Sequence, residues 1–536
     1  RRPFSATRDA RWSAMITVPC LFLLAALAGV WLLVGGANHD QHAAGTRRLR
    51  PSAAYASLRR TSAGLSLPLR SMYDRLMRSD AGDAAFPLYN AGLPRFPRNF
   101  ARDSLLSALL TDDLIMLEAQ LRQCAAKQGQ KRDPSTGEEP GKVHHETPGV
   151  RLGGRTTAYA ASDTTALFLI GVFRALQLRG ELPTRADAAP GTPRLESPLW
   201  SELRGNVELA LAYIDAHIDG DGRFFEDPAL AGAEAFALPV TYWKDSPLLS
   251  RRSRFPIVYW LVHAMSVAAL RGCAMLQGPS SLAAKLYARA LPPLRGWLSR
   301  VASQAPTTAP GEATAIEIAT DGQGPIMAKS SDALHALFFL HPSELPPGAA
   351  SAIETLASGL ETPFGYLAQR LDAGDATTAG VDMYHANDVW PWEQAALHAG
   401  SQSHGLVRAP AVAASMAVVL RALGSAPELL RVGLPDVARW QQRTTRETAA
   451  QLTRREGLPR VSRARSGARA RVERGGVSAA EEGCDVQLWT LAAAAYFADV
   501  SHRLPTPVGG EASAANAPPS RDAPALRGVP TPRDAP

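Results

Sequence analysis

The amino-acid sequence predicts an all-α fold, a toroid in which the helices are arranged in pairs. Three observations lead to this fold class. About a dozen stretches place apolar residues at the three- and four-residue spacing of a helix, strand-like alternation is scarce, and the intervening loops hold Gly, Pro and polar residues. With 536 residues, of which 46% are hydrophobic and 20% charged, the chain can bury a large core.

The expected helices fall in one block, residues 70–505, which we interpret as a single domain. The clearest apolar runs are residues 105–117 and 166–176. Further helical stretches are expected near residues 203–217, 257–276, 283–302, 333–340, 349–360, 394–398, 412–423, 437–452 and 486–500. Because helical signals are many and strand signals few, helix pairs closing into a ring fit the pattern better than a sheet does.

Residues 14–36 form an uncharged segment rich in Leu, Ala and Val. At about 1.5 Å per residue, a helix of this length crosses the hydrocarbon core of a bilayer, so we expect a transmembrane signal anchor. The basic tail at residues 1–13 favours a cytoplasmic N-terminus. A single-pass membrane protein is then expected, with a stem at residues 37–69 and a luminal or extracellular domain. A cleaved signal peptide is the alternative, because small residues follow the apolar run at 35–37.

The net charge of +7 is concentrated in an insertion at residues 454–474, which holds eight arginines among Gly, Ser and Ala. This insertion lacks interleaved aromatic residues, so no nucleic-acid partner is expected and we interpret it as a solvated, flexible segment. The tail at residues 506–536 is rich in Pro and Ala and is expected to be disordered. The four cysteines lie far apart and match no metal-binding spacing, so neither a metal nor another cofactor is expected.

Residues 384–394 combine two Trp, a Tyr, a His and two carboxylates within eleven positions. Aromatic side chains such as His385, Trp390 and Trp392 can cover the apolar face of a sugar. Carboxylates such as Asp388 and Glu393 can grip its hydroxyls or move protons at the glycosidic oxygen. The alternative is a Pro-containing loop in which Trp392 anchors the core and Glu393 is a charge at a helix N-terminus.

A second aromatic and acidic cluster holds Trp243, Lys244 and Asp245. A carboxyl group beside Trp243 in a dry pocket has a raised pKa and can serve as a general acid, although Lys244 would oppose that shift if it pointed the same way. The alternative is a buried Trp beside a Lys-Asp pair on the surface.

Three earlier segments carry polar groups at the starts of helices or in loops. Arg102 and Asp103 stand side by side where a helix begins and can present a donor and an acceptor to one ligand. His145 and Glu146 follow in a polar loop, and Asp163 precedes the apolar run at 166–176. Each has a simpler explanation as a surface ion pair, a solvated loop or a helix cap.

The order of these motifs resembles the amylo-α-1,6-glucosidase part of glycogen debranching enzymes, and more broadly it is similar to the six-hairpin glycosidases. The likeness covers about residues 70–503. The segments that carry it are Phe100–Ser104, Gly141–Glu146, Ser162–Phe168, Tyr242–Ser246, Ser331–Leu337, Thr362–Gly365, Val389–Glu393 and Gly483–Trp489. The resemblance implies an (α/α)6 toroid, in agreement with the helical pattern.

The resemblance also implies roles for single residues. Asp245 would be the general acid, and Arg102 with Asp103 would hold the non-reducing glucose. The same pocket would be lined by His145, Glu146 and Asp163. The two aromatic clusters add Trp243, Lys244, His385, Trp390 and Trp392 as candidate substrate-binding residues. The base is less defined, because relatives place it in different loops. Glu393 is the first choice, with Asp388, Glu473 and Glu482 as alternatives.

The sequence therefore predicts a membrane-anchored glycoside hydrolase that cleaves α-linked glucose from an oligosaccharide or glucan. An inverting mechanism is expected, with water between the two carboxyl groups. The second hypothesis is a catalytically weak relative that binds carbohydrate or serves as an anchored scaffold.

Overall fold

The structure is a computed structural model that describes most of the expected domain. The described residues are 69–78, 88–182, 197–246, 248, 251–305, 313–372, 384–444, 447, 451, 456–463 and 469–503. The expected tail at 1–13, anchor at 14–36, nearly all of the stem at 37–69 and the tail at 506–536 lie outside them. In the part of the chain that is described, no helix has the length and hydropathy needed to cross a bilayer.

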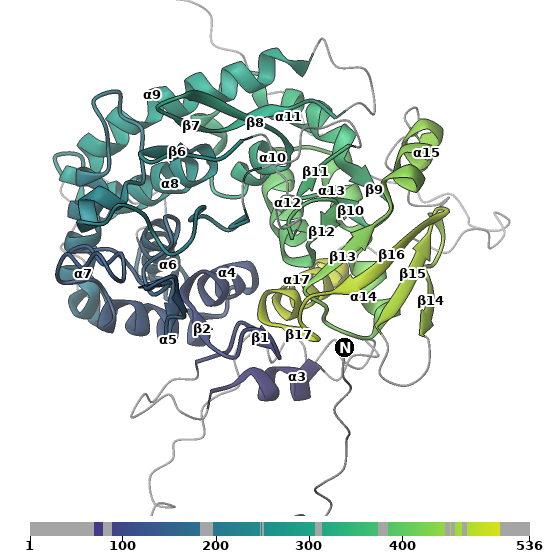
Figure 1. The fold of residues 1–536 in the computed structure, drawn as a ribbon, viewed down its shortest axis with the longest axis horizontal. Helices are drawn as coiled ribbons and strands as arrows, with labels where there is room; N and C mark the ends of the chain where they lie inside the picture. The colour runs from purple at the N-terminus through teal and green to yellow at the C-terminus, as the bar shows by residue number, and fades with distance from the viewer. Residues whose placement is uncertain are drawn as a thin grey trace, which may run out of the picture.

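A closed ring of helices forms the centre of the described domain (Figure 1). Its members are α4 (Ala101–Thr111), α6 (Thr164–Leu178), α8 (Trp260–Gln277), α10 (Asp332–Ala336), α12 (Pro391–Ser403) and α17 (Leu488–Arg503). Each packs against the next in this order, and α17 closes the ring by packing against α4. Most residues of α4 and α8 are buried all round, as expected for helices covered on every side.

Outer helices pack against this ring, and they lie between successive inner helices in the chain. They are α5 (Leu114–Ala126), α7 (Pro198–Ala216), α9 (Leu282–Ser303), α11 (Ala349–Ala357), α13 (Arg408–Ala413) and α14 (Ser415–Leu423), while α3 (Leu69–Leu76) packs on α17. In α9 the buried residues Leu286, Ala290 and Leu294 recur at helical spacing and leave the opposite face to solvent. The predicted helix-rich fold is confirmed, and the helix pairs can be followed in these contacts.

Two antiparallel sheets lie outside the all-α prediction, which is wrong in this respect. One has the order β12 (Asp388–Val389), β13 (Leu429–Val432), β16 (Val477–Glu482), β15 (Ala470–Arg474) and β14 (Arg460–Arg463). The other has the order β11 (Gln369–Arg370), β8 (Gly324–Ser330), β7 (Ile316–Asp321) and β6 (Ile257–Tyr259). Several of these strands have only two or three residues, too short for alternation to show in the sequence.

The smaller elements connect the ring helices. The two-stranded pairs are β1 (Gly92–Leu93) with β17 (Val486–Gln487), β2 (Asn99–Phe100) with β3 (Glu146–Thr147), β4 (Arg151–Leu152) with β5 (Arg155–Thr156), and β9 (Glu361–Thr362) with β10 (Gly365–Tyr366). The remaining helices are η1 (Pro228–Ala231), η3 (Pro342–Glu344), η4 (Ser358–Leu360) and α15 (Leu434–Thr444).

The arginine-rich insertion is more ordered than expected, because its described residues contribute β14 and β15. Along β15 the side chains of Ala470, Val472 and Arg474 are buried, whereas Arg471 and Glu473 are exposed. The interpretation of this segment as a solvated, flexible insertion is therefore wrong for these strands. Arginines stand at both exposed and buried positions of β14 and β15, so charge hides the alternation of β15 in the sequence.

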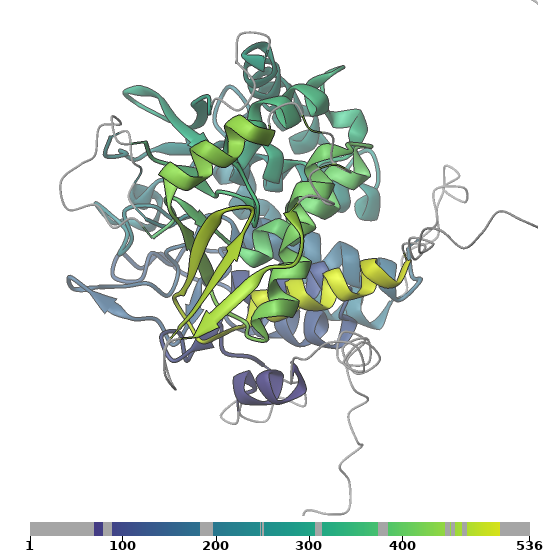
Figure 2. The ribbon, with the colours of Figure 1, turned by 90° about the vertical axis from the view of Figure 1, so that its right-hand side faces the viewer.

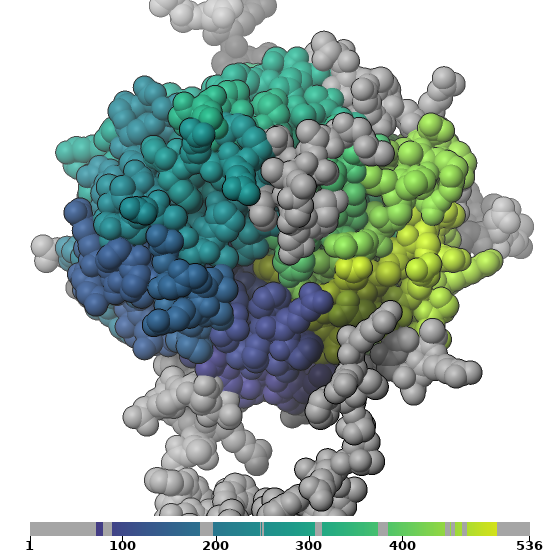
Figure 3. All heavy atoms as spheres, in the orientation of Figure 1, coloured from purple at the N-terminus to yellow at the C-terminus, as the bar shows by residue number. Residues whose placement is uncertain are grey.

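The first turns of the ring helices lie close together at one end of the ring. Arg102 of α4 contacts Asp163 at the start of α6, and Ser331 before α10 contacts Glu393 in the first turn of α12. In Figure 2 the yellow-green strands of the five-stranded sheet lie at the end where α17 begins. Figure 3 shows the ring closure on the surface, where purple N-terminal atoms adjoin yellow C-terminal atoms. Residues far apart in the sequence thus meet at this end.

Candidate active site

Arg102 lies between two carboxylates at the end of the ring. Its Nε donates to Asp163 Oδ2 over 2.8 Å, and its Nη1 lies 3.8 Å from Asp245 Oδ2. Arg102 and Asp163 are buried, whereas 29% of the Asp245 side chain is accessible to solvent. The structure therefore brings these three predicted residues together and leaves Asp245 open to a solute.

The Asp245 carboxyl is held in a state suited to proton donation. Burial raises its pKa to about 6, Arg102 opposes this shift, and the negative charges of Asp163 and Glu428 add to it. The neighbouring Asp103 is buried more deeply, and its pKa is raised to about 8 by burial against the opposing effect of Arg102. At neutral pH Asp103 thus keeps its proton, whereas Asp245 is protonated mainly below about pH 6, still well above the range of an ordinary aspartate.

A carboxylate absent from the sequence-based predictions, Glu428, belongs to the same cluster. It lies just before β13 and is only 1% exposed. Its Oε1 accepts a hydrogen bond from Tyr384 Oη, and its Oε2 accepts one from the Cys484 backbone N–H over 2.7 Å. Glu428 also contributes to the raised pKa values of Asp245 and Asp103, which places its charge within electrostatic reach of both.

The pKa of Glu428 itself is raised by burial, while the donors from Tyr384 and Cys484 and the charge of Arg95 oppose the shift. Gly483 makes this packing possible. It has φ of +81°, and a Cβ at this position would lie 2.1 Å from Glu428 Oε2. A glycine is thus needed both for the backbone conformation and for the close approach of the carboxylate.

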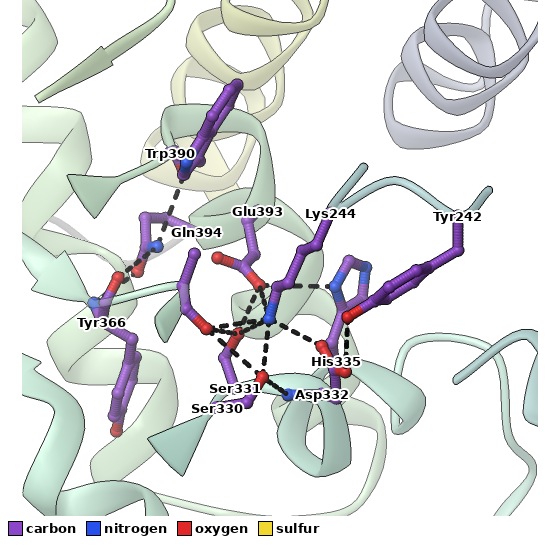
Figure 4. A network of polar contacts seen from close by, with 11 residues as sticks. Tyr242, Lys244, Ser330, Ser331, Asp332, His335, Tyr366, Trp390, Glu393 and Gln394 are labelled. Atoms are coloured by element: carbon purple, nitrogen blue, oxygen red, sulfur yellow. Dashed lines mark hydrogen bonds and ion pairs between the residues drawn. The ribbon is translucent and has the colours of Figure 1, made fainter. Parts of the chain in front are cut away.

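The predicted base Glu393 lies in a sealed network centred on Lys244 (Figure 4). Lys244 Nζ lies 2.6 Å from Asp332 Oδ1 and 3.8 Å from Glu393 Oε1. It also donates to the hydroxyls of Ser330 and Ser331 and to the Ala368 carbonyl over 2.8–2.9 Å. The side chains of Lys244, Asp332 and Glu393 are fully buried. Both Lys244 and Glu393 therefore face the interior.

The electrostatics of Glu393 differ from those of Asp245. Burial acts to raise the pKa of Glu393, but the Lys244 charge, His335 and the Ser331 hydroxyl outweigh it and keep the pKa below its ordinary value. The Ser331 Oγ donates to Glu393 Oε1 over 2.5 Å. Glu393 is thus a stable anion that balances a buried cation.

The alternative bases are engaged in the five-stranded sheet. Asp388 is buried and accepts two hydrogen bonds from Arg431, at 3.0 and 2.9 Å. Glu482 is 37% exposed and lies 3.4 Å from the same arginine. Glu473 is exposed on β15. Asp388 and Glu482 are thus tied to a surface arginine of the sheet, and Glu473 faces solvent.

The predicted aromatic residues form a packed layer behind Asp245. The rings of His385, Trp390 and Trp392 lie edge-on to Trp243 with centroids 4.8–5.9 Å apart. All four residues are buried, and Trp392 also stacks on Trp489. Within the described residues, the indole N–H groups of Trp243, Trp390 and Trp392 have no hydrogen-bond partner. The rings of this layer pack against one another next to the loop of Asp245.

His145 lies near Arg102, and Glu146 supports the loop. Burial and the charge of Arg102 hold the pKa of His145 well below its ordinary value, so the ring is neutral. Its Nδ1 contacts the Thr157 carbonyl at 3.2 Å, while its Nε2 has no partner in the described structure. Glu146 pairs with Arg98 at 2.6 Å and accepts from the Thr157 hydroxyl.

Comparisons with known proteins give only distant likenesses. No family model and no curated protein sequence matches the chain. Among solved structures, a GH63 mannosylglycerate hydrolase from Thermus thermophilus in complex with glucose is 14% identical, with a TM-score of 0.46 over 80% of this chain and 99% of that one. A wild-type glycosidase is 14% identical, with a TM-score of 0.41 over 84% and 98%. An uncharacterized conserved protein from Thermus thermophilus is also 14% identical, with a TM-score of 0.45 over 80% and 98%. Likenesses this distant assign neither a family nor an activity, so function is argued from the site.

Proposed function

We propose that this protein is an inverting glycoside hydrolase that cleaves α-linked glucose from an oligosaccharide or glucan. One observation carries the proposal. Asp245 and Glu428 come from separate loops, and the charge of Glu428 adds to the rise in the pKa of Asp245. Asp245 is partly accessible with a pKa raised to about 6, whereas Glu428 is buried and its pKa is also raised by burial. The resemblance in motif order supports α-linked glucose as the sugar.

The two carboxyl groups take opposite roles in this reaction. Asp245 donates its proton to the glycosidic oxygen as the bond to the anomeric carbon breaks. Glu428 accepts a proton from a water whose oxygen forms the new bond from the opposite face. The product is then glucose of inverted configuration, and the two carboxyl groups need a separation of roughly 6.5–9.5 Å to admit that water.

Glu428 replaces Glu393 as the proposed base because their partners differ. Lys244, His335 and the Ser331 hydroxyl keep the pKa of Glu393 below its ordinary value, so Glu393 is a poor proton acceptor. Glu428 has neutral donors at both oxygens, and its pKa stays raised by burial although the charge of Arg95 opposes the shift.

Sugar binding is assigned to the polar groups around Asp245. Arg102 Nη2, Asp163 Oδ1 and His145 Nε2 are buried and have no hydrogen-bond partner in the described structure. Hydroxyl groups of a pyranose both donate and accept, so they can satisfy this mixed set. The second candidate, a carbohydrate-binding relative with weak catalysis, is favoured by one observation, the capture of both Glu428 oxygens by donors.

The experiment compares two substrates, maltose and α-glucosyl fluoride. Fluoride leaves without protonation, so Asp245→Asn should lose about 10²-fold or more in turnover on maltose and far less on the fluoride. Glu428→Gln should lose activity on both. The first product anomer, followed by NMR, should be β-glucose. Near-normal maltose turnover by Asp245→Asn, or α-glucose as first product, would overturn the mechanism.

We further propose that residues 14–36 anchor the protein in a membrane, with the domain luminal or extracellular. The uncharged segment and the basic tail before it support this topology. In sealed vesicles carrying the protein in its cellular orientation, protease should digest the domain only after the membrane is opened. Digestion in intact vesicles would contradict it.

A further inference from the structure

Two consecutive residues, Tyr384 and His385, contact both loops that carry the proposed catalytic carboxylates. Tyr384 Oη donates to Glu428 Oε1. His385 Nδ1 forms a hydrogen bond with Oγ of Ser246, the residue that follows Asp245. Neither contact has a part in the mechanism above, yet together they join the acid loop to the base loop.

The aromatic layer holds these two residues in place. The His385 ring stacks on Trp390, with centroids 4.9 Å apart and planes 14° apart. It also lies edge-on to Trp243 at 5.5 Å. The Tyr384 ring lies edge-on to Trp390 at 5.2 Å. Because Trp390 is fully buried directly before α12, both rings rest on a rigid part of the ring of helices.

We propose that Tyr384 and His385 form a clamp that sets the spacing between Asp245 and Glu428. The inference rests on the proposed function. Neighbouring Cα atoms lie about 3.8 Å apart, so the two attachment points cannot separate independently. An inverting reaction needs room for one water between the carboxyl groups, and a misplacement of about 1 Å can lower the rate about 10²-fold. Both are positioning residues, because they act through Glu428 and through the Asp245 loop.

The clamp also affects the ionisation of Glu428. The groups that act on Glu428 are the Tyr384 hydroxyl, the Cys484 N–H and thiol, Arg95, and the carboxyls of Asp103 and Asp245. Of these, Tyr384 opposes the increase in pKa that burial causes. Its own pKa is raised well above the ordinary value, so it stays protonated and keeps donating. Removing its hydroxyl should therefore raise the pKa of Glu428.

The test uses maltose and α-glucosyl fluoride with variants on each side of the clamp. Tyr384→Phe keeps the ring and removes the donor to the base, so kcat should fall about 10- to 100-fold on both substrates with little change in KM. Ser246→Ala and His385→Phe loosen the acid side, so they should lower kcat on maltose and largely spare the fluoride. A general loosening of the fold would lower both substrates equally in all three variants.

The pH profile supplies an independent readout. Glu428 must be ionised to accept a proton, so activity is lost as the pH falls through its pKa. Because Tyr384→Phe raises that pKa, the acid limb of kcat/KM should shift to higher pH, while Ser246→Ala should leave this limb in place. Ser246→Ala removes one half-buried hydroxyl and keeps the test decisive if a ring variant fails to fold.

Tyr213→Phe is the matched control, because Tyr213 is a buried tyrosine that donates to the buried carboxylate of Glu226 at 3.3 Å. It should change neither kcat nor the acid limb. The clamp is overturned if Tyr384→Phe matches this control, or if Ser246→Ala lowers both substrates equally. If the clamp is overturned in this way while Asp245→Asn and Glu428→Gln are inactive on maltose, the proposed function still stands. Full maltose activity in those two variants would instead overturn the function itself.

Discussion

Two buried glutamates, Glu393 and Glu428, lie at similar depth in surroundings of opposite character. Glu393 faces a lysine that also binds Asp332, and its pKa is lowered despite burial. Glu428 accepts hydrogen bonds from neutral donors, and burial raises its pKa although the charge of Arg95 opposes the shift. Burial and aromatic neighbours therefore do not distinguish a catalytic carboxylate from a structural one. The surrounding donors and charges do, because they lower the pKa of Glu393 and make it a poor proton acceptor, whereas the pKa of Glu428 is raised.

The largest effect is expected where the charge balance of the Glu393 region is broken. Lys244→Met leaves two buried carboxylates without their cation, so the free energy of unfolding should fall by about 3–5 kcal/mol. Urea denaturation at pH 7 measures this change. A loss below about 1 kcal/mol would show that water or rearrangement compensates and that the network is not sealed.

The second largest effect is expected on kcat, which should respond differently to substitution of Glu428 and of Glu393. Glu428→Gln should lower kcat on maltose about 10²-fold or more, whereas Glu393→Gln should change the free energy of unfolding more than kcat per folded molecule. Steady-state kinetics, normalised to the folded fraction by circular dichroism, provide both numbers. A silent Glu428→Gln beside an inactive Glu393→Gln would reverse the assignment.

The raised pKa values of Asp245 and Asp103 should make the stability of the fold depend on pH. A carboxyl group whose folded pKa is raised stabilises the fold fully at low pH, and this contribution is lost as the pH rises through the folded pKa. For Asp245 and Asp103 the folded values are about 6 and about 8, so stability should decline between roughly pH 4 and 8. Asp103→Asn should flatten this decline, and thermal melts across that range would show an unchanged slope if the prediction is wrong.

In the proposed mechanism, the ionisation of Asp245 sets the upper pH limit of activity. Asp245 donates a proton, so kcat/KM should fall as the pH rises above about 6. Activity that stays constant to pH 9 would indicate a different acid.

The smallest effect tests the close packing around Glu428. A Cβ at Gly483 would lie 2.1 Å from Glu428 Oε2, so Gly483→Ala should shift the carboxylate and lower kcat about tenfold. Gly457→Ala is the control, because Gly457 also has positive φ, of +61°, but nothing lies within 4 Å of the added methyl group. It should lower stability by about 1–2 kcal/mol through backbone strain and leave kcat unchanged.

The sequence was sufficient for the helices and for naming Arg102, Asp163 and Asp245, which the structure brings together. Helical periodicity is local, and the spacing of Leu286, Ala290 and Leu294 is visible without the structure. Asp245 stood out because Trp243 precedes it. The two-residue strands and the arginine-bearing β14 and β15 gave no readable alternation, since their pairing depends on partners far along the chain.

The proposed base Glu428 could not be found in this way, because the contacts that single it out are not local. Glu428 is a single acid before an apolar pair of leucines, and its partners Tyr384 and Cys484 lie 44 and 56 residues away. Glu393 was favoured because tryptophans flank it, and nothing nearby in the sequence indicates that Lys244 binds it from another loop. Two features of the sequence could have pointed to Glu428. It is a lone carboxylate directly before an apolar run, and Gly483, far along the chain, is a residue that allows another group to approach closely.

The closure of the ring by α17 against α4 also governs how the chain is made. From Ala101 to Leu488 the ribosome must add 488 − 101 = 387 residues, which takes about 20–80 s at about 5–20 residues per second. Throughout that interval the apolar face of α4 that will meet α17 has no partner on the nascent chain. Arg102 and Asp103 are thus synthesised early, but their surroundings are completed only when the last ring helix emerges. We therefore expect biosynthesis of this domain to depend on factors that shield exposed helices until the chain is released.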